Sequence, residues 1–183
     1  MKPRHSSTIE ESSTLTHETI PARRSRASVH THKGIKIERD IVIDRPAAGL
    51  FNFWRKFDNL PKVMRHVESV KCLDARRSRW RMSQAGNKII EWEAEIINEH
   101  PNELIAWRTL PGSDVQHAGS VRFTPTANGR STEVKLTLEY EVEGGLLKNI
   151  LARIFGASPE HEIEEDLLRF KKLMTGRPWA MSS

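Results

Sequence analysis

The chain has 183 residues, a length that predicts one domain together with some tail residues. Its net charge of +5 is spread along the chain, so composition does not favour a dedicated nucleic-acid-binding face. A single cysteine excludes an intramolecular disulfide, and the N-terminus lacks the apolar core of a secretory signal, so we expect a cytoplasmic protein.

Residues 1–32 are rich in Ser, Thr, His and Arg and poor in large apolar side chains. Such a composition cannot offset the entropy of ordering by burial, so it predicts a disordered tail. Arg23, Arg24 and Arg26 could contact anionic lipid or RNA, but a solvated tail is the favoured interpretation. No specific nucleic-acid partner is therefore expected.

We expect no metal and no cofactor. His30 and His32 lack a third ligand, and Cys72 has no His or Cys partner nearby in the sequence. The chain also lacks a glycine-rich phosphate loop, paired cysteines and a nucleophile elbow.

The ordered pattern begins near residue 33. Apolar and polar residues alternate over 34–43, which predicts a half-buried strand. Asp44 as an N-cap and Pro46 at the first helical position then predict a helix over 46–57. We expect a second short helix at about 61–66.

Six further strands are predicted in the middle of the chain, separated by short polar connections. They cover 67–74, 77–84, 87–98, 103–110, 117–125 and 131–141. Connections this short join antiparallel neighbours, because a parallel return needs a long crossover. The alternation within the strands predicts a sheet with one buried face and one solvent-exposed face.

The C-terminal part carries two apolar segments. Residues 146–155 form an amphipathic stripe, interpreted either as a gate beside the pocket that contacts the inner membrane face or as a packed helix that closes the end of the barrel. Ser158 as an N-cap and Pro159 at the first position predict a long helix that Gly176 ends. Residues 177–183 are expected to form a tail.

The apolar face of such a sheet must be buried, and the C-terminal helix is the one element long enough to lie across it. We therefore predict an α+β helix-grip fold: a seven-stranded, curved antiparallel sheet around a long C-terminal helix. The domain is expected to span residues 33–176.

Several short motifs follow one another in a specific order over residues 33–175. They are Ile41–Pro46, Phe53–Arg55, Asn59–Pro61 with Met64, Glu91–Ile96, Ile105–Arg108, Gly119–Phe123, Gly144–Gly145, Asp166–Leu167 and Arg169–Lys171. In these motifs the chain resembles the START-like (SRPBCC) superfamily, and within it the bacterial polyketide cyclase/dehydrase and coenzyme-Q-binding START-type proteins. The resemblance implies a cavity between sheet and C-terminal helix that holds a lipid, a quinone or a polyketide-like molecule.

The inward-facing residues of the strands and the long helix are the candidates to line that cavity. They are Trp92, Trp107, Phe123, Leu138, Tyr140, Ile163, Leu167 and Phe170. Arg39 falls on the isoleucine face of its strand, which makes it either a polar anchor for the ligand or a strand-edge arginine. The alternative for the whole set is that these side chains fill a solid core.

Catalysis would need a general acid or base in the cavity, and His117 with Tyr140 is the candidate pair because both are expected to point inward. Arg108 is expected on the outer face, paired with Glu93 or Glu95. Three functions stay open: a non-enzymatic carrier of a hydrophobic molecule, a cyclase/dehydrase-type enzyme on an aromatic substrate, and a protein-interaction module. The carrier is favoured, and the oligomeric state is not predicted.

Overall fold

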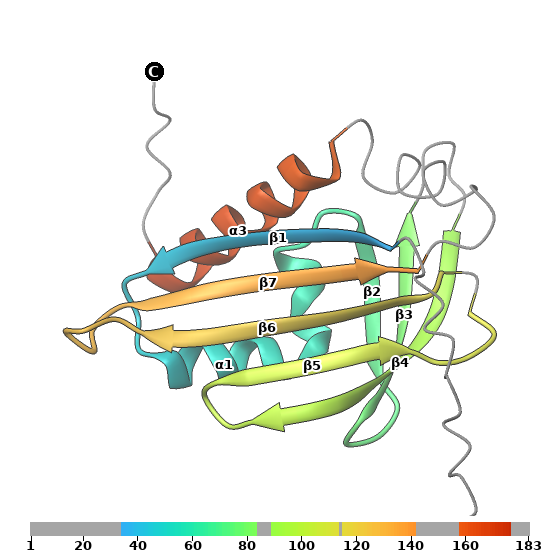
Figure 1. Cartoon of the computed structure of the whole chain (residues 1–183), viewed down its shortest axis with the longest axis horizontal. Coiled ribbons are helices and arrows are strands. Elements are labelled where there is room, and N and C mark those ends of the chain that lie inside the picture. The colour runs from blue at the N-terminus through green and yellow to red at the C-terminus, as the bar shows by residue number, and fades with distance from the viewer. Residues whose placement is uncertain (1–33, 84–88, 114, 142–157, 177–183) are drawn as a thin grey trace, which may run out of the picture. The chain divides into compact units, whose positions relative to one another are not determined.

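The computed structural model describes residues 34–83, 89–113, 115–141 and 158–176. In chain order the elements are β1 (Ile35–Ile43), α1 (Ala47–Arg55), η1 (Phe57–Lys62), β2 (Val67–Cys72), β3 (Arg77–Ser83), β4 (Ile89–His100), β5 (Leu104–Thr109), β6 (His117–Pro125), β7 (Thr132–Tyr140) and α3 (Pro159–Thr175). Figure 1 shows the strands as one curved sheet with the helices on one of its faces. The tail at 1–32, the stripe at 146–155 and the tail at 177–183 lie outside the described residues.

The sheet confirms the predicted architecture. Its seven strands follow the order β1-β7-β6-β5-β4-β3-β2, and every neighbouring pair is antiparallel. The strands from β2 to β7 form the expected meander, and β1 forms one edge of the sheet by pairing with β7 (Figure 1). The α+β helix-grip fold predicted from the alternation is thus the observed one.

Two strands end two residues away from the predicted position. β2 stops at Cys72 instead of residue 74, because Asp74 Oδ1 accepts the backbone N–H groups of Arg76 and Arg77, each at 2.8 Å. This side-chain hydrogen bonding builds the turn that starts β3. β4 continues to His100, where a turn was expected, after a bulge between Ile96 and Asn98 that shifts its register and bends the strand.

The start of α1 also corrects a prediction. Asp44 does not cap this helix; Pro46 occupies the N-cap position, and Asp44 Oδ1 accepts a hydrogen bond from Ser131 Oγ at 2.9 Å. Ser131 precedes β7 and is 87 residues away in the sequence, so the Asp44 carboxylate takes part in a tertiary contact.

The second helical segment lies earlier than predicted, as the 3-10 turn η1 at Phe57–Lys62. Asn59 Nδ2 donates to the carbonyl of Phe53 at 3.1 Å and so satisfies an acceptor near the end of α1. Phe57 and Leu60 are buried, and their burial fixes the segment at this position.

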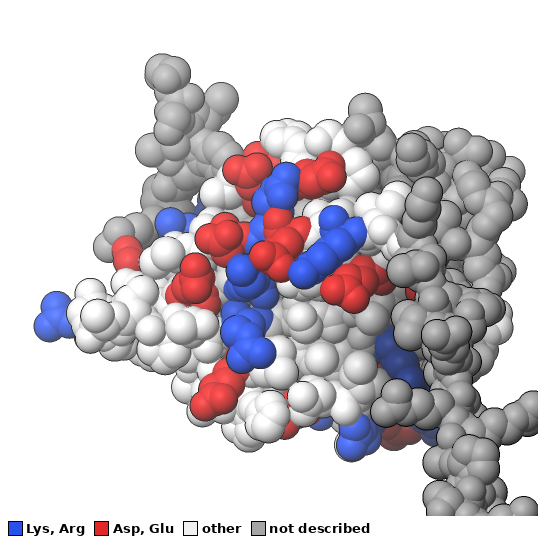
Figure 2. Space-filling view, viewed as in Figure 1, with Lys and Arg blue, Asp and Glu red and all other residues white. Residues whose placement is uncertain are grey.

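The outer face of the sheet is charged, as the alternation predicts. Figure 2 shows basic and acidic side chains interleaved across it. Arg108 lies opposite Glu95 in the β4–β5 register and pairs with it at 2.7 Å, while Arg79 pairs with Glu93 at 2.7 Å. These exposed pairs contribute at most about 1 kcal/mol each, so they keep this face in water rather than hold the fold together.

The inner face is held by an aromatic cluster that joins α1, α3 and β6. Phe170 of α3 packs against Trp54 and Phe53 of α1 with ring centroids 5.2 and 5.3 Å apart. Phe123 of β6 packs edge-on against Phe51 and Trp54.

The long helix ends where predicted, since Gly176 adopts the left-handed conformation and its N–H donates a hydrogen bond to the carbonyl of Lys172.

We expect Phe170→Ala to lower the free energy of unfolding by about 3–5 kcal/mol, because the ring is fully buried in the aromatic cluster. Leu173→Ala is the matched control on the same helix, since Leu173 is 49% exposed, and should change it by less than about 0.5 kcal/mol. Urea unfolding followed by circular dichroism measures both. Equal effects of the two substitutions would show that α3 is not fixed through this cluster.

Candidate ligand-binding pocket

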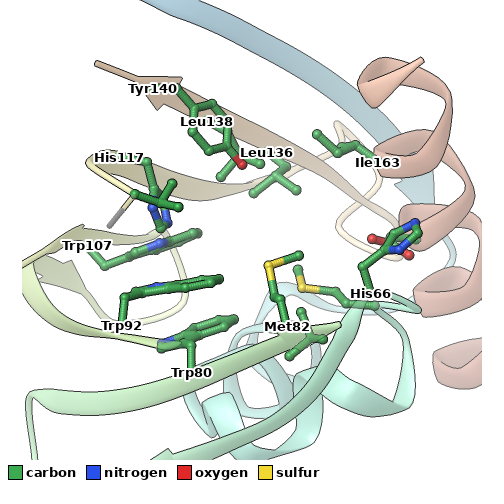
Figure 3. Close-up of a pocket in the computed structure, with 14 residues that line it drawn as sticks. His66, Trp80, Met82, Trp92, Trp107, His117, Leu136, Leu138, Tyr140 and Ile163 are labelled. Atoms are coloured by element: carbon green, nitrogen blue, oxygen red, sulfur yellow. The ribbon is translucent and has the colours of Figure 1, made fainter. Parts of the chain in front are cut away.

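A pocket lies between the inner face of the sheet and α3. Its described lining consists mainly of apolar and aromatic side chains from β2 to β7, from the η1–β2 connection and from α3 (Figure 3). These residues are Met64, His66, Val67, Trp80, Met82, Trp92, Trp107, Val115, His117, Leu136, Leu138, Tyr140, Ile163 and Asp166.

The pocket volume of about 60 Å³ limits what fits without movement. One water molecule needs roughly 10–15 Å³ on this measure, and a cavity that binds benzene holds about 150 Å³. A ring-sized ligand therefore requires lining side chains to shift. Met64 and Met82 are suited to this because an unbranched thioether side chain changes rotamer at low cost.

One side of the pocket is an indole wall formed by Trp80, Trp92 and Trp107 on β3, β4 and β5. Trp80 and Trp92 are direct cross-strand partners with rings nearly parallel, 6.1 Å apart. Phe57 of η1 packs against the wall, with its ring centroid 5.5 Å from Trp80 and 5.7 Å from Trp107. Figure 3 shows the three indoles one above another. Successive strands supply them because each tryptophan stands at an inward position of the pleat.

Gly119 makes room for this wall. It lies opposite Trp107 on β6, and a Cβ atom at Gly119 would overlap Trp107 Cζ2. No side chain can occupy this position unless the indole moves. The absence of a side chain at 119 therefore sets where Trp107 borders the pocket.

His117 and Tyr140 lie together at one end of the pocket. They are partners in the β6–β7 register, and their rings stack 5.4 Å apart. Burial lowers the pKa of His117 to about 4, against a smaller opposing effect of the nearby Val115 backbone. Burial also raises the pKa of Tyr140. Both side chains are therefore uncharged at neutral pH.

Several polar side chains lie on the side of the pocket that faces α3 (Figure 3). His66 Nε2 is 3.1 Å from Glu162 Oε2. Asp166 Oδ1 accepts hydrogen bonds from the Arg65 backbone N–H at 3.2 Å and from the Arg169 guanidinium. Burial raises the pKa of Asp166, and these two hydrogen bonds oppose the rise. Polar side chains thus border the pocket at two separate places.

Only some of the candidate residues proposed from the sequence border the pocket. Six of them border the pocket: Trp92, Trp107, His117, Leu138, Tyr140 and Ile163. Phe123, Leu167 and Phe170 belong instead to the solid core. Arg39 stands half-buried on the edge strand β1, where its Nη1 donates to the Glu38 carbonyl at 2.7 Å, and it does not border the pocket.

Sequence reasoning missed several residues that border the pocket. Trp80 and Met82 alternate on one predicted strand, so extending the alternation argument to that strand would have found them. Asp166 interrupts the apolar stripe of α3 between Ile163 and Phe170, and an acid at a core position is itself a signal. Leu136 stands on the same face of its strand as Leu138 and Tyr140, so the alternation marks it as well. Val115 lies outside the strands and carried no signal beyond hydrophobicity.

Among the described residues, no group of three or more His, Cys, Asp or Glu side chains could hold a metal ion. Within the same ranges, the helices are too short or too polar to span a membrane.

The curved sheet, the long helix and the pocket between them define a START-like protein. Residues 43–168 match the model of the family described as polyketide cyclase / dehydrase and lipid transport, and the chain belongs to this family.

Three relatives illustrate the match. A crystal structure from Deinococcus radiodurans is 33% identical, covers 78% of this chain and 100% of its own, and superposes with a TM-score of 0.63. An uncharacterized 17.2 kDa protein of Streptomyces lincolnensis is 27% identical over 142 residues, which is 78% of this chain and 91% of that protein. An aromatase/cyclase from Streptomyces sp. R1128 shares the fold, with 19% identity, 82% and 99% coverage and a TM-score of 0.64.

Gly119→Ala should destabilise the fold by about 1–3 kcal/mol, because the new methyl group forces the Trp107 indole out of its position. Gly49→Ala is the control: no atom lies within 4 Å of its Cβ position on α1, so alanine there should be neutral or stabilise by up to about 1 kcal/mol. Thermal unfolding compares them, and an unchanged Gly119→Ala protein would contradict the close packing.

The buried His117 predicts an acid-sensitive fold. Its pKa is 6.5 when unfolded and about 4 when folded, so the unfolded chain binds the proton more tightly and stability falls as the pH drops from 6.5 toward 4. The difference corresponds to about 3 kcal/mol over this window.

His117→Phe should therefore flatten the dependence of unfolding free energy on pH between 6.5 and 4, while His161→Gln, at an exposed position of α3, should keep it. Urea denaturation at closely spaced pH values tests this. The same slope in wild type and His117→Phe would mean that His117 is charged in the folded protein.

Proposed function

We propose that this protein binds a hydrophobic, ring-containing small molecule in the pocket and carries or senses it rather than converts it. The observation that carries the proposal is the indole wall, which gives one side of the pocket rigid aromatic surface. Flat apolar rings gain most from such a surface, both by burial and by offset or edge contacts. The remaining lining is aliphatic apart from a few polar side chains at two places.

Membership of the family supports this proposal at the level of hydrophobic ligands, and it leaves enzymatic turnover open. The aromatase/cyclase of Streptomyces sp. R1128 shares the fold at 19% identity, which does not carry its reaction to this chain. The choice between carrier and enzyme therefore rests on the chemistry of the pocket residues.

An enzyme of the cyclase/dehydrase type is the second candidate, because His117 and Tyr140 stand side by side in the pocket. General acid–base catalysis works best when the pKa of the group lies near the working pH. Burial shifts both pKa values away from neutral pH: the pKa of His117 falls to about 4 and that of Tyr140 rises. His117 is then a poor base and Tyr140 a poor acid at neutral pH, which favours binding over turnover.

A protein-interaction module, the third possibility, requires no internal space. The pocket argues against it, because tight packing is the normal state of a protein interior and an apolar cavity costs stability. Contact of residues 146–155 with a membrane stays a prediction, since those residues lie outside the described ranges.

Native mass spectrometry of the protein purified from its own host, followed by solvent extraction, tests the proposed function. We expect a co-purifying apolar molecule that is lost on denaturation. Ile163→Trp should abolish the extra mass by filling the pocket from α3, whereas Leu173→Trp on the exposed face of the same helix should retain it.

If Ile163→Trp fails to fold, Ile163→Phe replaces it as a smaller obstruction. An extra mass that persists in folded Ile163→Trp and Ile163→Phe would place the ligand elsewhere. A bare protein mass in the wild type, together with no uptake of added toluene, would overturn the proposed function.

A further inference from the structure

Two polar atoms at the pocket lack a hydrogen-bond partner among the described residues. They are Trp92 Nε1 and His117 Nδ1, and both are inaccessible to solvent. Their side chains are more than nine-tenths buried, with 6% and 9% of the surface exposed. The two rings meet edge to face with centroids 5.5 Å apart, so the two atoms belong to one small region of the pocket.

The other tryptophan of the β3–β4 pair shows what a satisfied indole looks like here. Trp80 Nε1 donates to Ser78 Oγ at 2.9 Å, within its own strand. Trp92 stacks directly on Trp80, yet the described chain offers its N–H no acceptor. Buried donors in native proteins are nearly always paired, so an exception that borders a pocket points to a partner from outside the chain.

The chemistry of the two atoms defines that partner. An indole N–H only donates, so Trp92 requires an acceptor. The Nδ1 of an uncharged imidazole donates or accepts according to its tautomer. A hydroxyl oxygen satisfies both atoms by accepting from Trp92 and donating to His117, and a carbonyl oxygen does so by accepting from both.

A charged oxygen is a poor match for the same place. The described lining contains no Lys or Arg, and its one acidic side chain is Asp166. Burying a carboxylate without a cationic partner is far more costly than burying a hydroxyl group. The described lining therefore favours an uncharged oxygen.

We propose that Trp92 and His117 form a polar anchor for one hydroxyl or carbonyl oxygen at the edge of an otherwise apolar ring in the ligand. Figure 3 shows the imidazole of His117 directed toward the indole wall, where the ring of such a ligand would lie. The anchor rests on the proposed function and adds to it the class of ligand: phenol-like or quinone-like rings rather than pure hydrocarbons or carboxylates.

The test is a calorimetric titration of the full chain with phenol and toluene, which have the same number of non-hydrogen atoms and differ in the oxygen. Trp92→Phe and His117→Phe should each weaken phenol binding roughly 3- to 10-fold, the usual effect of one hydrogen bond. Each substitution should change toluene binding by a smaller factor than phenol binding, so that the phenol-to-toluene affinity ratio falls. Benzoate, with the same ring and a negative charge, should bind more weakly than phenol.

Trp80→Phe is the matched control, because it removes an indole whose N–H already bonds Ser78. It should weaken phenol and toluene by the same factor, since only ring contact is lost. If a phenylalanine variant does not fold, the indole N–H resonance of Trp92 in the wild type replaces it. That resonance should shift on adding phenol and stay in place on adding toluene.

The outcomes separate the anchor from the proposed function. Binding of both probes with a phenol-to-toluene ratio unchanged in both variants overturns the anchor and leaves a hydrophobic site. Tighter binding of benzoate than of phenol contradicts the inference that the anchor prefers an uncharged oxygen. Failure of phenol and toluene alike to bind the wild-type chain overturns the proposed function itself.

Discussion

The covered face of the sheet depends on one set of contacts, the aromatic cluster in which Phe170 of α3 and Phe123 of β6 meet Trp54 of α1. A curved antiparallel sheet with one apolar face has no stability until that face is buried. The cluster buries it with three elements at once. It fixes α3 relative to the strands, and through α3 it fixes the distance between helix and sheet at the pocket.

The same contacts explain why the interior is solid at one end and hollow at the other. Phe123 and His117 stand on the same face of β6 but six positions apart, which is about 20 Å along an extended strand. Helix α1 fills the interior near Phe123. Near His117 the described chain places no helix residue of similar size opposite the indole wall, and the pocket lies there.

Burial at the pocket then decides its chemistry. His117 and Tyr140 lose solvent, so their charged forms become costly and both remain neutral. A dry site with neutral polar atoms is suited to hold a molecule by shape and by hydrogen bonds. Its acid–base strength at neutral pH is low, because the pKa values lie far from the working range. The pocket is thus better built for recognition than for proton transfer.

The sequence by itself determined the elements and the fold, because the period of the apolar residues depends only on local backbone geometry. It also placed Trp92, Trp107 and Tyr140 on the inner face. It could not separate these from Phe123 and Phe170, because a buried residue of the core and a buried residue of a pocket leave the same alternation. Only the tertiary structure made that distinction, through the cross-strand register and the position of α1. The same reason explains Asp44: the helix has Pro46 at its N-cap position, and the Asp44 carboxylate accepts a hydrogen bond from the distant Ser131. Local sequence rules identify which polar groups need hydrogen-bond partners, and the tertiary structure determines which partners they have.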